Sequence, residues 1–206
     1  MFMNRQSVRT LFRVAGMSLA VALVAGCAGT KVERVTHDSV IDLSGKWNDT
    51  DSRLVAEEML RDCLSSAWYK PYEAQGKAPT VIVGSVRNKS HEHIETETFI
   101  KDIERTLINS GKVDFVANKT ERDQLREERA DQATNSSVDT RSAAGEESGA
   151  ELMLIGTINS IVDKEGNKSV VFYQVNLELV NIESNRKLWI GDKKIKKYVT
   201  NSAASL

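Results

Sequence analysis

"KSVVFYQVNLELVNI", residues 168–182, is the stretch that decides the fold. Apolar side chains occupy every second position from Val171 to Leu179, and mostly polar side chains such as Gln174 and Glu178 stand between them. Successive side chains of a β-strand point to opposite faces of the sheet. The pattern therefore predicts an antiparallel strand with one face on a core and the other in water.

The flanking segments extend this strand into a meander. "ELMLIGTINSIVDK" (151–164) precedes it across Glu165-Gly166-Asn167, a sequence typical of a tight hairpin turn. "RKLWIGDKKIKKYV" (186–199) follows it after a second turn, and its lysines suit an edge strand that must not aggregate. We therefore expect three consecutive antiparallel strands at the C-terminal end.

The first half of the chain predicts a helix followed by a strand. "NDTDSRLVAEEMLRDCLSSAW" (48–68) opens with good helix-capping residues and then carries apolar residues at helical spacing. Cys63 falls on the apolar face, where a small buried hydrophobe is a better interpretation than a catalytic thiol. "AWYKPYEAQGKAP" (67–79) is interpreted as a loop, and "TVIVGSVRN" (80–88) as a strand.

Residues 92–112 predict a second amphipathic helix. Its large apolar residues are spaced by four, acidic residues fill its first turn, and Gly111 is placed to end it. These apolar residues are Phe99, Ile103 and Leu107. "KVDFVAN" (112–118) then predicts a second strand, with Val113 and Phe115 buried.

The remaining elements complete a mixed fold. Residues 119–137 are charged almost all round, which predicts an exposed helix, and residues 138–150 predict a short helix ending near Gly149. The expected fold class is α/β or α+β: a small mixed β-sheet with an antiparallel C-terminal meander, flanked by about four helices. We expect one globular domain at 49–200 and a C-terminal tail at 201–206.

The N-terminus has the features of a secretion signal. Three arginines precede an apolar run of about 12 residues, whereas a membrane-spanning helix needs ~20. The run ends in Val24-Ala25-Gly26-Cys27, which resembles the bacterial lipobox. We therefore expect a lipoprotein signal peptide at 1–26 and acyl chains on Cys27, which anchor the chain stably in a membrane. The alternative is an ordinary signal peptide with a chance cysteine.

Residues 27–48 are expected to form the lipidated N-terminus and a short tether. Ala28 and Gly29 follow the lipidated cysteine. By resemblance to enterobacterial sorting rules, the lack of aspartate there indicates the outer membrane, on its periplasmic face. Once Cys27 is lipidated, Cys63 is the only thiol left, so no intramolecular disulfide is expected.

Composition and motifs argue against several classes of protein. The 28 Lys+Arg and 29 Asp+Glu residues are balanced, unlike those of a basic nucleic-acid binder. The sequence has no GxSxG, P-loop, HExxH or CxxC motif. His91-Glu92-His93 could bring two imidazoles together, but without a third nearby histidine a solvated loop is the better interpretation. We expect no enzyme activity, metal, cofactor or small-molecule substrate.

Four stretches resemble the LpoB family. They are "TVIVGSVRNKS" (80–90), "LINSGKVDFVAN" (107–118), "DTRSAAGEESGAELMLIGTI" (139–158) and "LVNIESNRKLWIGDKKI" (179–195). The resemblance extends over Thr50 to Tyr198 and rests on the order and spacing of elements. It implies a fold similar to the TolB N-terminal domain, and an outer-membrane lipoprotein that activates a class A penicillin-binding protein and thereby regulates cell-wall synthesis.

The tether departs from the enterobacterial members of the family, whose long tethers are rich in proline. The stretch from Cys27 to Trp47 has no proline. It reaches at most ~70 Å when extended and averages ~25 Å as a coil. Either the synthase comes out to the domain, or the partner differs. A structural or assembly lipoprotein of the envelope, with a TolB-like fold, is the alternative function.

A binding module without pocket chemistry must present a surface, and aromatic residues are common anchors of such surfaces. Trp68, Tyr69 and Tyr72 are the candidate partner-binding residues because they follow the first helix in an expected loop. Trp189 is a weaker candidate, because a tryptophan in a strand usually belongs to the core. The alternative for all four is packing against the sheet.

Overall fold

The structure is a computed structural model, and it describes residues 30–142 and 145–201. The chain divides into two units, Met1–Ser39 and Val40–Leu206. In the described part of the first unit, the backbone amide of Ser39 donates a hydrogen bond to the carbonyl oxygen of Thr36. The rest of the fold described here belongs to the second unit. The predicted domain bounds, 49–200, stay a prediction.

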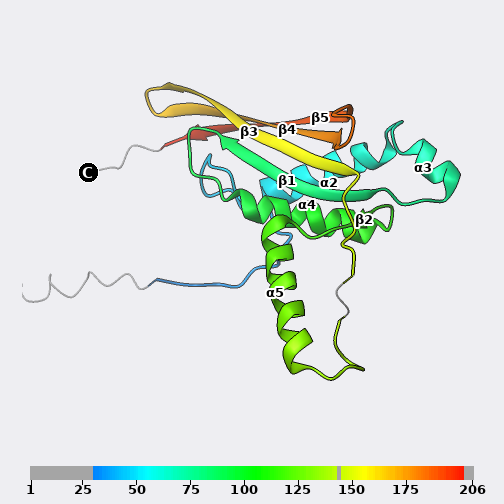
Figure 1. Cartoon of the computed structure of the whole chain (residues 1–206). Helices are drawn as coiled ribbons and strands as arrows, with labels where there is room; N and C mark the ends of the chain where they lie inside the picture. The colour runs from blue at the N-terminus through cyan, green and yellow to red at the C-terminus, as the bar shows by residue number, and fades with distance from the viewer. Residues whose placement is uncertain (1–29, 143–144, 202–206) are drawn as a thin grey trace, which may run out of the picture. The chain divides into compact units, whose positions relative to one another are not determined.

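Five strands form one mixed sheet in the order β2-β1-β3-β4-β5 (Figure 1). β1 (Thr80–Lys89) runs parallel to both of its neighbours, β2 (Asp114–Phe115) and β3 (Leu152–Glu165). β4 (Lys168–Asn181) and β5 (Lys187–Thr200) continue antiparallel. The mixed sheet with a C-terminal meander is confirmed, although β2 is only two residues long.

The alternation in β4 places its side chains as the sequence predicts. Every second residue from Val171 to Leu179 is at most 7% exposed, while the residues between them are partly exposed. β3 and β4 pair in one unbroken register from Leu152–Asn181 to Glu165–Lys168. Gly166, at φ 57°, supplies the left-handed backbone that the tight turn needs.

Two helices, α2 (Asp49–Ser65) and α4 (Thr96–Ser110), lie along the buried face of the sheet (Figure 1). Asn48 starts α2 through reciprocal side-chain hydrogen bonds with Asp51, as in a capping box. Gly111 ends α4 in the left-handed conformation, at φ 63°. Both predicted helices are confirmed. The core between helices and sheet includes Val55, Leu60, Phe99, Ile103, Leu107, Leu154, Ile158, Tyr173 and Leu177.

The segment predicted as a loop after α2 holds a short helix, α3 (Lys70–Gln75). Pro71 stands in its first turn, where its fixed φ suits a helix and its missing N–H leaves no bond unmade. Gly76, at φ 62°, ends it. These punctuating residues explain why a six-residue helix forms here.

α5 (Lys119–Asn135) is the predicted exposed helix, and none of its residues is buried. The short helix predicted over 138–150 is wrong for the described part of that segment, which has turns and no regular structure. Glu147 from this segment accepts two hydrogen bonds from Arg126, at 2.9 and 2.8 Å, and one from Arg129, at 3.3 Å. These arginine contacts tie the segment to α5.

The segment 42–47, which the sequence assigns to the tether, packs against the domain; we call it the strap. The Trp47 ring lies edge-on to Phe99 and Tyr173, with centroid distances of 6.2 and 5.6 Å. Close approach to the strands is possible because Gly45 has no side chain: a Cβ there would lie 2.4 Å from Val199. The strap thus closes one end of the sheet.

Candidate functional site

Three of the four predicted anchor residues gather at the other end of the sheet; we call Trp68, Tyr69 and Tyr72 the aromatic cluster. The Trp68 ring centroid lies 5.6 Å from that of Tyr69 and 6.0 Å from that of Tyr72, both edge-on. All three side chains are half-buried. The sequence prediction named these residues, and the structure brings them together.

Each ring of the aromatic cluster is held by a named contact. The Trp68 indole donates a 2.7 Å hydrogen bond to the carbonyl oxygen of Cys63, near the end of α2. The Lys112 ammonium lies 5.2 Å from the Tyr69 ring centroid, within cation–π range. The Tyr72 hydroxyl donates to the Glu151 carboxylate. The cluster is therefore positioned by the end of α2, by Lys112 between α4 and β2, and by Glu151 just before β3.

Tyr72 is a poor acid because of its surroundings. Burial, followed by the hydrogen bond to the Glu151 carboxylate, raises the pKa of Tyr72 to about 12. Like any tyrosine it is protonated at neutral pH, and the raised pKa lets the hydroxyl continue to donate to Glu151 in more alkaline solution. This keeps the ring oriented beside Trp68.

A groove of about 610 Å³ opens next to the aromatic cluster. It is lined by α3 and the chain on either side of it, by Glu151, and by residues in and around the β4–β5 turn. These residues are Trp68, Pro71, Tyr72, Gln75, Lys77, Ala78, Glu151, Asn181, Ser184, Arg186 and Leu188. An aromatic wall beside a groove with polar and cationic groups can seat a projecting segment of another protein.

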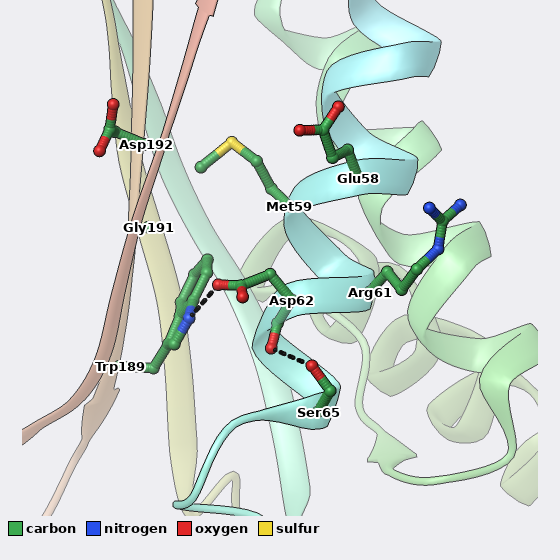
Figure 2. A pocket seen from close by; sticks show the side chains of 8 residues that line it. All are labelled: Glu58, Met59, Arg61, Asp62, Ser65, Trp189, Gly191 and Asp192. Carbon is green, nitrogen blue, oxygen red and sulfur yellow. Dashed lines mark hydrogen bonds between the residues drawn. The ribbon is translucent and has the colours of Figure 1, made fainter.

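Trp189 lies apart from the aromatic cluster. It is 8% exposed and belongs to the core, and its indole donates a 2.9 Å hydrogen bond to Asp62 on α2 (Figure 2). A Cβ on Gly191 would lie 2.2 Å from the Trp189 ring, so the ring rests directly on the glycine backbone. The residue fastens α2 to β5, as expected for a tryptophan in a strand.

A buried polar network at the strap end went unpredicted. The Tyr173 hydroxyl donates to Glu92 and lies 3.1 Å from the carbonyl oxygen of Gly45, and the backbone amide of Trp47 donates to the same glutamate at 2.9 Å. Burial, and then the bond to Glu92, raises the pKa of Tyr173. Sequence periodicity places Tyr173 in the core but gives no sign of its distant partners.

Lys197 adds a second tie between β5 and the strap. Its ammonium donates to Asp51 at 2.6 Å, to Asp42 at 2.9 Å and to the Lys46 carbonyl oxygen at 3.0 Å. Burial lowers the pKa of Lys197, but the hydrogen bonds to the two carboxylates outweigh it and raise the pKa overall. One lysine of the predicted solubilising edge is thus structural.

The side chains that could have served in catalysis or metal binding are buried or bonded to other residues. Cys63 is buried, and burial raises the pKa of its thiol to about 12, which makes it a poor nucleophile. His91 Nδ1 lies 2.6 Å from the Ser160 hydroxyl. Within residues 30–142 and 145–201, no cluster of three metal-ligating side chains occurs.

The predicted lipidation site, Cys27, lies outside the described residues, as does the predicted signal peptide. In the part of the chain that the structure describes, no helix is long and apolar enough to cross a bilayer.

Comparison with known proteins identifies the family. Solved structures similar to this chain include the LpoB C-terminal domains of Escherichia coli (15% identity, TM-score 0.43) and Salmonella enterica (13% identity, TM-score 0.42), each covering 71% of this chain and 99% of the other. The solution structure of E. coli LpoB is 12% identical with a TM-score of 0.42, covering 86% of this chain and 87% of the other. No curated protein matches the sequence. Residues 51–195 match the family model described as "Peptidoglycan-synthase activator LpoB", and the chain belongs to this family.

Proposed function

We propose that this protein is an outer-membrane lipoprotein facing the periplasm, which binds a class A penicillin-binding protein and activates its peptidoglycan synthesis. Membership of an activator family supports a synthase as the partner. The observation that carries the choice of surface is the aromatic cluster beside an open groove.

The aromatic cluster has the composition of a binding hot spot. Trp and Tyr bury a large area at a small entropic cost, and anchors of this kind sit beside pockets at the centre of interfaces. Trp68 is also packed against the core. A partner would therefore meet a surface that is already ordered, which reduces the entropy lost on binding.

Lipidation of Cys27 would place the domain close to the membrane. The strap begins at Asp42, so the free tether spans roughly 15 residues and reaches at most ~50 Å when extended. This is shorter than the reach estimated for a tether ending at Trp47. A synthase in the inner membrane would have to extend a periplasmic region toward the domain.

The end of the sheet that carries the aromatic cluster, which we call the open end, lies far from the strap. Residues Val171 to Asn181 of β4 separate the two ends, a span of about 33 Å at ~3.3 Å per residue. The tether enters through the strap, so the aromatic cluster is carried at the opposite end of the domain. We propose that activation follows when the cluster binds the active conformation of the synthase more tightly than the inactive one.

The surface is tested with the Trp68→Ala/Tyr69→Ala double variant, in binding and glycan-polymerisation assays with a purified class A synthase. Because hot-spot residues contribute at least ~2 kcal/mol, we expect affinity to fall by about 30-fold or more, with loss of activation. The control is Leu125→Ala/Ile161→Ala, which removes two side chains that are 49% and 66% exposed elsewhere. Circular dichroism checks that both variants fold.

Two results would count against the proposal. Unchanged affinity of a folded double variant removes this surface. Failure of the wild-type protein to bind any class A synthase rejects the activator function and favours an envelope lipoprotein with another partner, which a pull-down from solubilised envelopes would recover.

The anchor is tested separately by mass spectrometry of the mature protein. We expect acyl chains on an N-terminal Cys27, and we expect Cys27→Ser to give an unlipidated precursor that is not retained in the outer membrane. A mature protein with a free, unmodified N-terminus would contradict the anchor.

A further inference from the structure

A second groove, of about 410 Å³, runs between α2 and the edge strand β5 (Figure 2). It is lined by Glu58, Met59, Arg61, Asp62, Ser65, Trp189, Gly191 and Asp192. None of these residues lines the groove beside the aromatic cluster, so a ligand bound here is independent of the proposed function.

The strand beside this groove has one free edge. β5 is the last strand of the sheet, and among residues 30–142 and 145–201 no strand pairs with its outer edge. It is 14 residues long. An edge strand flanked by a helix is a geometry in which an extended peptide adds as a further strand and inserts alternate side chains into the groove.

The floor of the groove is preorganised. Gly191 contributes no side chain, and the Trp189 ring lies against it, fixed by the hydrogen bond to Asp62. Figure 2 shows the Asp62 carboxylate turned toward the strand. The Trp189 ring therefore covers Gly191 on the helix side, and the unpaired backbone groups of β5 lie along its outer edge.

Charge distinguishes the two sides of the free edge. On the helix side, Glu58 and Asp62 stand one turn apart on α2, and Glu58 is bonded to Lys193. On the opposite face, β5 presents Lys194 and Lys196, which pair across the sheet with Gln174 and Phe172. Lys194 is paired with Asp192 at 3.0 Å. An added strand would thus meet an excess of carboxylates over ammonium groups on the helix side, and the reverse on the opposite face.

We propose that the free edge of β5 binds an extended segment of a protein partner by strand addition. The segment carries basic or amide side chains toward Glu58 and Asp62, and acidic side chains toward Lys194 and Lys196. Main-chain hydrogen bonds to β5 supply affinity, and the alternating charges fix the register and the face.

A second copy of this chain is a poorer occupant. β5 contains five lysines and one aspartate, so pairing two β5 edges would bring many like charges together. The lysines that discourage self-association favour a partner strand with acidic residues on that face.

The test uses the mature chain and an end-capped decapeptide of alternating lysine and glutamate, followed by amide chemical shifts. We expect shifts confined to β5, the Trp189 indole and adjacent α2, and binding about tenfold tighter than that of a decapeptide with lysines and glutamates in separate blocks. N-methylation of either all lysines or all glutamates blocks one edge of the peptide. One of these two peptides should lose binding and the other should keep it.

The charge requirement is tested with Glu58→Gln/Asp62→Asn, which removes two charges and keeps an acceptor for Trp189. We expect this variant to bind about tenfold more weakly. The matched control, Glu127→Gln/Asp131→Asn, makes the same change at the same spacing on α5 and should bind as wild type.

The proposal would be overturned by the absence of shifts on β5, by equal binding of the alternating and block peptides, or by equal binding of the two methylated peptides. Shifts on β5 that grow with protein concentration alone would overturn it too, and would assign the edge to a second copy instead.

Discussion

Each end of the sheet has a tyrosine that donates to a glutamate, and the two pairs differ in burial. At the strap end, Tyr173 is fully buried and donates to Glu92, which also accepts from the Trp47 amide. At the open end, half-buried Tyr72 donates to exposed Glu151 beside a groove. The same chemical contact therefore closes the fold at one end and orients a surface at the other.

Because of this difference in burial, we expect the two ends to contribute to different properties, one to stability and the other to binding. Loss of a buried partner leaves a desolvated polar group behind, whereas loss of an exposed one lets water replace it. We therefore expect substitutions at the strap end to change unfolding and those at the open end to change partner affinity.

The largest expected effect is in the core that both ends share. Leu177 is fully buried and Leu107 is 3% exposed, so replacing either by alanine should lower the free energy of unfolding by about 2–5 kcal/mol. Glu127→Ala, on exposed α5, should stay within ~0.5 kcal/mol. Urea midpoints give the comparison, and midpoints that barely move for both leucines would refute the assigned core.

The two tyrosines should respond unequally to loss of their hydroxyls. Tyr173→Phe leaves Glu92 without its buried donor and should cost about 1–3 kcal/mol. Tyr72→Phe lets water replace the hydroxyl at Glu151, which is already exposed, and should stay within ~0.5 kcal/mol. Equal losses in urea unfolding would contradict the distinction between the two ends.

A smaller effect on the free energy of unfolding is expected when Tyr173 loses its proton at alkaline pH. Folding raises the pKa of Tyr173, so its contribution to stability is complete below pH 10, the ordinary value, and is lost as the pH rises toward the folded pKa. Between pH 10 and 11, wild type should lose about 1 kcal/mol more than Tyr173→Phe. Thermal unfolding across this range measures the difference. Parallel curves for the two proteins would remove Tyr173 as the cause.

Regular patterns made much of the fold predictable. The alternation from Val171 to Leu179 and the helical spacing of Phe99, Ile103 and Leu107 report local geometry that burial then enforces. Asn48 and Gly111 mark helix ends for the same local reason. Features set by neighbouring residues were therefore recovered.

Features that depend on residues far apart in the sequence could not be predicted. The strap looks like tether because its ties to Tyr173 and Lys197 join residues more than a hundred positions apart. The segment 138–150, predicted as a helix, has no regular structure in its described part, and its Glu147 contacts arginines on α5 about twenty residues away in the sequence. At the candidate site, the three aromatic residues of the cluster were predictable, but the groove was not, because it is built from three separate parts of the chain, 68–78, Glu151 and 181–188.

The central claim is that the open end binds the synthase while the strap end stabilises the fold. It is tested most directly by the dissociation constants of Trp68→Ala/Tyr69→Ala and Tyr173→Phe for one class A synthase, at a temperature where both are folded. We expect at least ~30-fold weaker binding for the first variant and less than ~2-fold change for the second. Loss of affinity in Tyr173→Phe with full affinity in the aromatic variant would contradict the claim.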